Sequence, residues 1–191
     1  MGLLVLGLIL FFATHSISMI SEDWRHRQVA RLGEWRWKGL YSLVALVGLW
    51  LIIWGYGLAR YDPVVLYSSS VGLRHLALLL LIPVFPLLLA AYLPGRIQSL
   101  IHHPMLIATQ LWAIAHLLAN GTLADMLLFG TFLIWAVANH FSLKRRTPLF
   151  VPRAPLSPWN DYIAVIGGLA LYVAFILWLH IGLIGVSPIG R

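Results

Sequence analysis

The feature that most constrains this chain is a series of six apolar stretches, separated by short segments rich in charged residues, proline or glycine. A helix needs about 17–25 mostly apolar residues to cross a bilayer, and it satisfies its backbone hydrogen bonds internally. We therefore predict an all-α polytopic membrane protein, forming a single transmembrane helical domain over residues 1–191. The predicted helices cover about residues 2–20, 38–58, 72–93, 104–119, 122–142 and 161–185, the fourth being the shortest.

The composition agrees with a membrane protein. Hydrophobic residues make up 61% of the chain and charged residues 10%, against about 45–50% and about 25% in soluble domains. The chain has no cysteine, which excludes disulfides, thiolate metal sites and cysteine nucleophiles. The net charge of +7 does not indicate nucleic acid, because the basic residues lie in the gaps between apolar stretches instead of forming one face. The expected partner is the lipid bilayer.

The distribution of basic residues predicts the orientation in the membrane. Cytoplasmic loops carry an excess of lysine and arginine, and only Arg60, Arg74 and Arg191 lie on the other side. We therefore expect both termini outside, with a Trp- and Arg-rich interfacial segment at residues 21–38. The segments after the first, third and fifth helices hold ten basic residues: Arg25, Arg27, Arg31, Arg36, Lys38, Arg96, Lys144, Arg145, Arg146 and Arg153.

Short breaks separate the later helices. Pro94-Gly95 follows the third predicted helix, and Asn120-Gly121 separates the fourth from the fifth. In the sixth, Ala164 and Gly168 form a small-xxx-small pair, which indicates tight helix packing. Residues 143–160 form an expected extended polar loop, because proline interrupts helices; its prolines are Pro148, Pro152, Pro155 and Pro158.

Acidic residues are few, and none lies in the middle of a predicted helix. Ion carriers and proton pumps commonly place carboxylates at membrane depth. Their absence there argues against a carboxylate-based carrier, and no Ser-His-Asp arrangement is evident. The six acidic residues are Glu22, Asp23, Glu34, Asp62, Asp125 and Asp161.

Histidine is the main candidate for chemistry. His15, His116, His140 and His180 fall within four different predicted helices. For any one of them a hydrogen bond between helices is the ordinary role, but four helices that each contribute one imidazole favour a bound group. A closed zinc or di-iron site lacks thiolates and buried carboxylates here. Haem needs only one or two axial imidazoles and an apolar slot between helices.

Depth in the membrane leaves the pairing of these histidines open. By the predicted topology His15, His103 and His140 lie near the cytoplasmic end, whereas His75, His116 and His180 lie nearer the outside. Geometry alone would pair His15 with His140, and His116 with His180.

Residues 102–121, HHPMLIATQLWAIAHLLANG, resemble the signature of the NnrU family, and Thr14-His15-Ser16 with its following basic loop fits the same pattern. The resemblance spans most of the chain. It implies a multi-pass protein of the bacterial inner membrane, linked to denitrification and nitric oxide metabolism. The family is related to 15-cis-zeta-carotene isomerase, a membrane enzyme that contains haem b.

This resemblance implies site residues. His15 and His116 match positions associated with haem ligation in the isomerase, so they are the candidate haem-b and metal ligands. His103, of the His-Pro pair, matches a family histidine with a supporting role, and His140 lies near a later one. Ala113 stands where the isomerase has cysteine, so the isomerase's thiolate ligand has no counterpart here.

The resemblance leaves three functions open. The first is a haem-b protein of nitrogen-oxide metabolism, or a haem-dependent isomerase or redox enzyme acting on a lipophilic small molecule. The second is a non-enzymatic membrane factor that supports expression or assembly of nitrite or nitric oxide reductase. The third is methyl transfer from S-adenosylmethionine, because His103-Pro104 at a helix start is similar to isoprenylcysteine carboxyl methyltransferases. There, however, Met105 to Ala108 replace the expected Tyr and Gly.

Overall fold

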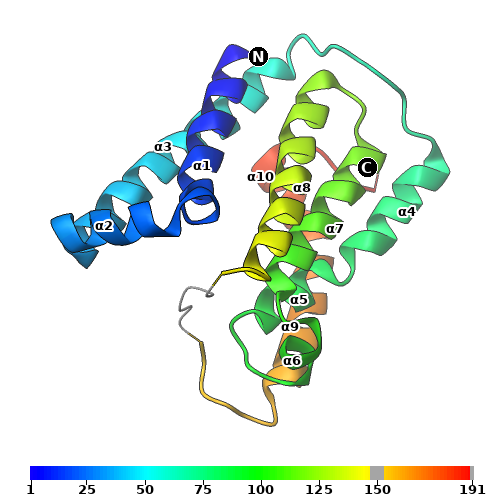
Figure 1. Cartoon of the computed structure of the whole chain (residues 1–191). Helices are drawn as coiled ribbons and strands as arrows, with labels where there is room; N and C mark the ends of the chain where they lie inside the picture. The colour runs from blue at the N-terminus through cyan, green and yellow to red at the C-terminus, as the bar shows by residue number, and fades with distance from the viewer. Residues whose placement is uncertain (147–152, 190–191) are drawn as a thin grey trace. The chain divides into compact units, whose positions relative to one another are not determined.

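The computed structural model of the chain describes residues 1–146 and 153–189 (Figure 1). Pro148 and Pro152 of the predicted loop, and Arg191 of the charge count, lie outside these residues. The described helices are α1 (Gly2–Ile20), α2 (Glu22–Leu32), α3 (Glu34–Ala59), α4 (Val71–Leu81), α5 (Val84–Ala90), α6 (Arg96–Ile101), α7 (Pro104–Ala119), α8 (Leu123–Leu143), α9 (Asn160–Ala174), the π-helical segment η1 (Phe175–Leu179) and α10 (His180–Ile184).

The predicted all-α, polytopic fold is confirmed. α7 has 16 residues, about 24 Å at about 1.5 Å per residue, and is the shorter apolar helix expected from the sequence. Which side of the membrane holds the termini stays a prediction. The segments that are long and apolar enough to cross a membrane are Gly2–Ile20, Glu34–Ala59, Val71–Ala90, Leu123–Leu143 and Asn160–Ile184.

The chain divides into two compact units, each built from two separate segments. Unit 1 comprises Met1–Ser68 and Asn120–Arg145, and unit 2 comprises Ser69–Ala119 and Arg146–Arg191. The prediction of a single domain stays a prediction.

In unit 1, α1 and α3 pack closely because glycines let their backbones approach. A Cβ added at Gly7 would lie 2.6 Å from the Ile52 nitrogen, and one at Gly48 would lie 2.8 Å from the Phe11 nitrogen. A Cβ at Gly55 would overlap the backbone of Leu4. Residue numbers fall on α1 as they rise on α3, so the helices are antiparallel, and Figure 1 shows them side by side. Close backbone approach at small residues is how helices associate in lipid.

The predicted interfacial segment forms α2, at one end of the α1–α3 pair (Figure 1). The side chain of Ser21 caps α2 by accepting from the Trp24 N–H. Gly33, at φ 81°, separates α2 from α3 in a conformation that side chains disfavour. α2 has no buried residue, and Trp24 contacts Trp37 of α3 at 5.8 Å between ring centroids. It has the composition of a helix lying at a membrane surface.

Asn120-Gly121 is held by the loop that follows α3. The Gly121 carbonyl accepts from the backbone N–H groups of Leu66 and Tyr67, and the Tyr67 hydroxyl donates to the Asn120 carbonyl at 2.8 Å. Gly121 is needed here because a Cβ would overlap the Tyr67 carbonyl oxygen. Burial, and the negative charge of Asp125, raise the pKa of Tyr67, which keeps its hydroxyl protonated as a donor.

In unit 2, the predicted helix at 72–93 is interrupted between α4 and α5. Pro83 and Pro86 lack the N–H groups that a continuous helix requires. The Ile82 N–H bonds the Leu79 carbonyl at 3.3 Å, which leaves the Leu78 carbonyl without its intrahelical donor. The Tyr172 hydroxyl of α9 donates to this carbonyl at 2.7 Å. A neighbouring helix thus satisfies the group that the kink releases.

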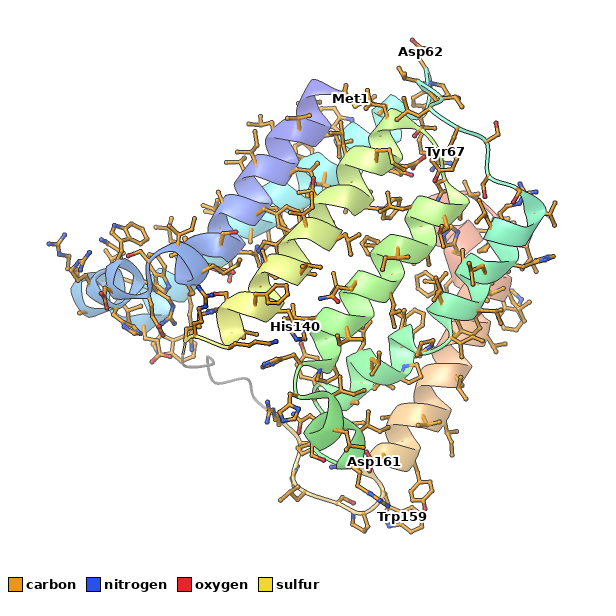
Figure 2. The ribbon with its side chains drawn as sticks, turned by 45° about the vertical axis from the view of Figure 1, so that its right-hand side comes forward. Met1, Asp62, Tyr67, His140, Trp159 and Asp161 are labelled. Carbon is orange, nitrogen blue, oxygen red and sulfur yellow. The ribbon has the colours of Figure 1, made fainter. Side chains whose placement is uncertain are left out.

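The small pair predicted in the sixth helix packs tightly, as expected. Ala164 is fully buried, and a Cβ at Gly168 would overlap the backbone of Pro86 in α5. At the start of α9, the Asp161 carboxylate accepts from the Arg96 N–H at 2.8 Å and the Ile97 N–H at 3.1 Å. Figure 2 shows Asp161 beside Trp159 at this end of unit 2. Asp161 therefore caps α6, directly after the predicted Pro94-Gly95 break.

Candidate functional site

His15 lies on α1, and its Nδ1 is hydrogen-bonded within that helix. Its Nδ1 is 2.7 Å from the Phe11 carbonyl oxygen. A carbonyl only accepts, so Nδ1 must carry the proton, and Nε2 of the neutral ring holds the free electron pair. The ring also stacks on Phe11, with 4.1 Å between centroids and 26° between planes. This is how metal-binding histidines are usually oriented, with the second ring nitrogen bonded to a carbonyl.

His116 on α7 repeats the arrangement in unit 2. Its Nδ1 lies 2.8 Å from the carbonyl oxygen of Trp112, again four residues earlier. The two rings are 5.1 Å apart at 49°. In both histidines the preceding helical turn supplies an aromatic contact and a carbonyl acceptor. Nδ1 is used for this bond in each ring, and Nε2 lies on the other side of the ring.

Aromatic rings surround His15 within unit 1. Tyr41 of α3 meets its ring edge-on at 5.5 Å, and Trp135 of α8 does so at 6.0 Å and 90°. Phe12 in turn contacts Phe132 at 4.8 Å and Trp135 at 5.6 Å. His15 therefore lies half-buried among aromatic side chains from three helices.

The indole nitrogen of Trp135 is buried, and within residues 1–146 and 153–189 it has no hydrogen-bond partner. A buried donor left in this state costs about 1–3 kcal/mol. Sequence reasoning did not single out Trp135, because a tryptophan in an apolar helix has no pattern that reveals an unpaired N–H.

The remaining histidines, including the proposed ligands His103 and His140, are placed differently. His140 lies towards the end of α8 in unit 1 (Figure 2), beside Phe141 at 6.3 Å. His103 directly precedes α7, where its carbonyl accepts from the Leu106 N–H at 3.1 Å. His180 in α10 bonds the Val186 carbonyl through Nδ1 at 2.6 Å. His26 is exposed on α2.

Two of the predicted ligands, His15 and His140, thus belong to unit 1, whereas His103 and His116 belong to unit 2. The described residues contain no group of three or more His, Asp or Glu side chains that could hold a metal ion. The ligand roles of all four histidines stay predictions.

A buried carboxylate also lies in unit 1, where the sequence indicated only a helix start. Asp125 is 4% exposed. Its carboxylate accepts from the Tyr56 hydroxyl at 2.6 Å, the Thr122 N–H at 2.9 Å and the Thr122 hydroxyl at 2.6 Å. The Thr-x-x-Asp spacing signals the capping of α8, but the bond from Tyr56, 69 residues away, has no local signal. We interpret this cluster as structural, joining α3 to α8.

Removing the Tyr56 hydroxyl should weaken unit 1. Tyr56→Phe leaves one buried carboxylate oxygen without its donor, so we expect the free energy of unfolding to fall by about 1–3 kcal/mol. Equilibrium unfolding of the purified protein in mixed micelles measures this. Tyr162, which is 62% exposed, supplies the control: Tyr162→Phe should change stability by less than about 0.5 kcal/mol. Equal stability of the two variants would contradict the proposed role of the bond.

Five helical segments long and apolar enough to cross a membrane, with no strand among the described residues, define an all-α polytopic membrane protein. His15 and His116 each bond a backbone carbonyl through Nδ1. The family model described as NnrU protein matches residues 3–188. The chain therefore belongs to the NnrU family. No curated protein and no solved structure matches it.

Proposed function

We propose that this protein binds haem b, with His15 and His116 as iron ligands. The observation that carries the proposal is the bond from Nδ1 of each ring to the carbonyl four residues earlier. In the neutral ring this bond leaves Nε2 as the unprotonated nitrogen, which is the form that an iron ligand requires. The same geometry at both positions, in two separate helices, favours a shared chemical purpose over two unrelated packing contacts.

The residues around His15 fit such a group. Haem needs apolar and aromatic side chains against its faces, and Phe11, Tyr41 and Trp135 surround this imidazole. The protein would hold and orient the ligand nitrogen through the Phe11 carbonyl and keep water away with the aromatic rings. Bound haem would supply one-electron exchange.

We further propose that the haem protein acts in nitrogen-oxide metabolism of a bacterial inner membrane, or in redox chemistry on a lipophilic substrate. Membership of the NnrU family favours the first role, and the apolar surroundings of His15 are compatible with the second. A lipid-soluble substrate could approach from the bilayer, because the transmembrane helices expose many large apolar side chains.

The test is the absorption spectrum of the protein purified from haem-replete cells. We expect a Soret band and a reduced-minus-oxidised difference spectrum typical of b-type haem, with haem copurifying in stoichiometric amount. Circular dichroism and gel filtration would show that the sample is folded. A folded, colourless protein that also fails to take up added haem would overturn the proposal and favour a non-enzymatic membrane factor.

A further inference from the structure

The unpaired indole N–H of Trp135 indicates a contact that the protein alone does not complete. Buried polar groups in native proteins nearly always have a partner. The Trp135 ring that carries this N–H lies 6.0 Å from the ring of His15, whose Nδ1 is bonded within its own helix. One ring thus offers a free electron pair and its neighbour offers a free proton donor. A haem group can satisfy both, because its iron accepts the electron pair of His15 and its carboxylate oxygens accept from the Trp135 N–H.

The charged residues near the end of α1 that carries His15 indicate what kind of oxygen would accept from the Trp135 N–H. His15 lies five residues before the end of α1, about 7–8 Å along the helix axis. The next helix, α2, packs against both α1 and α3. It carries Arg25, Arg27 and Arg31 beside Glu22 and Asp23 of its first turn, so its net charge is positive. Trp24, beside Arg25, contacts Trp37, one helical turn from the Tyr41 that meets His15. A basic helix so close to the site favours an anionic acceptor over a neutral one.

We propose that the Trp135 indole N–H donates a hydrogen bond to a carboxylate side chain of the porphyrin whose iron is held by His15. This rests on the haem proposal above and adds a residue that recognises the edge of the group. Trp135 is a positioning residue, because it orients the porphyrin in its plane and slows its departure. The basic residues of α2 would attract the porphyrin carboxylates, so these are expected at the α2 end of unit 1.

The experiment compares haem retention in the full-length protein, measured by transfer of haem to excess apomyoglobin. Trp135→Phe removes the N–H and keeps an aromatic ring, and we expect it to release haem about tenfold faster than wild type (about 1.4 kcal/mol). Both proteins are also loaded with haem dimethyl ester, in which the carboxylates are masked. With the ester the two rates should agree, because the charged acceptor is gone. Trp50→Phe, at a tryptophan 57% exposed, is the matched control and should equal wild type with both groups.

Three results would overturn the inference. Equal release of haem from Trp135→Phe and wild type would show that the indole is not a donor to the porphyrin. A tenfold difference with both haem and ester would mean that Trp135 acts by packing. A wild-type protein that binds no haem would overturn the haem proposal and this one with it. If Trp135→Phe fails to fold, replacement of Trp135 by benzothienylalanine, which substitutes sulfur for N–H at the same shape, gives the same comparison.

Discussion

His15→Ala should release haem from this protein. Loss of the outer hydrogen-bond partner of a metal ligand typically costs about 10–100-fold in affinity, so loss of the ligand itself should weaken haem binding by more than about 100-fold. The helix should survive, because alanine is the best helix former. The measurement is haem content per folded protein, with the reduced-minus-oxidised spectrum showing any change in ligation. Added imidazole should restore part of the spectrum by filling the cavity.

His116→Ala should alter the spectrum in the same direction, because His116 is the second proposed iron ligand and bonds a backbone carbonyl through Nδ1 in the same way. His26→Ala is the control, since His26 is exposed on α2, and it should leave haem content and spectrum unchanged. If His15→Ala and His116→Ala both kept a wild-type spectrum, neither histidine would be a ligand. If only His116→Ala kept it, His140→Ala would test the alternative partner that depth in the membrane suggested for His15.

Gly55→Ala should destabilise unit 1 by about 1–3 kcal/mol, the usual cost of overpacking, and Gly55→Leu by more. The added Cβ would overlap the backbone of Leu4, so α1 and α3 would have to separate. Leu4 is fully buried, and the same two helices bring His15 of α1 beside Tyr41 of α3. Unfolding in mixed micelles followed by circular dichroism measures the loss, and haem retention should fall with it.

Gly57 gives a control two residues away on the same helix. A Cβ at Gly57 meets nothing within 4 Å, so Gly57→Ala should leave stability unchanged or raise it by up to about 1 kcal/mol through helix propensity. A Gly55→Ala protein as stable as Gly57→Ala would show that the helices do not depend on this close approach.

Most of the fold could be predicted from hydropathy, because a membrane-spanning helix is formed by one continuous apolar stretch of the sequence. The short helix α7 was recognised with both ends correct, from Pro104 to Ala119. The interruption at Pro83 was missed, since a run of leucines on both sides conceals it. α6 was missed too, because its N-terminus is capped by Asp161, 65 residues later.

The candidate site could be predicted only as a set of histidines. The sequence and its family resemblance selected His15 and His116, but the carbonyl bonds at their Nδ1 atoms depend on side-chain rotamers. The contact between Trp135 and His15 and the bond between Tyr56 and Asp125 each join residues far apart in the chain. No local sequence pattern encodes such pairs. The packing of Gly48 and Gly55 was also overlooked, although glycines seven residues apart lie on the same face of a helix.

The two-segment construction of each unit sets the order in which the protein can assemble in the membrane. The α1–α3 hairpin is complete once residue 59 has been inserted, and its glycine seam joins neighbours in the chain. Unit 1 nevertheless cannot be completed before α8 is synthesised, and α8 follows α4 to α7 of the other unit in the chain. Unit 2 waits longer, because α5 is held by α9, and Gly168 and Pro86 that join them are 82 residues apart. During translation, therefore, the kinked pair α4 and α5 enters the bilayer well before Tyr172 arrives to satisfy the Leu78 carbonyl. Nascent chains stalled before α9 should be prone to degradation by membrane proteases.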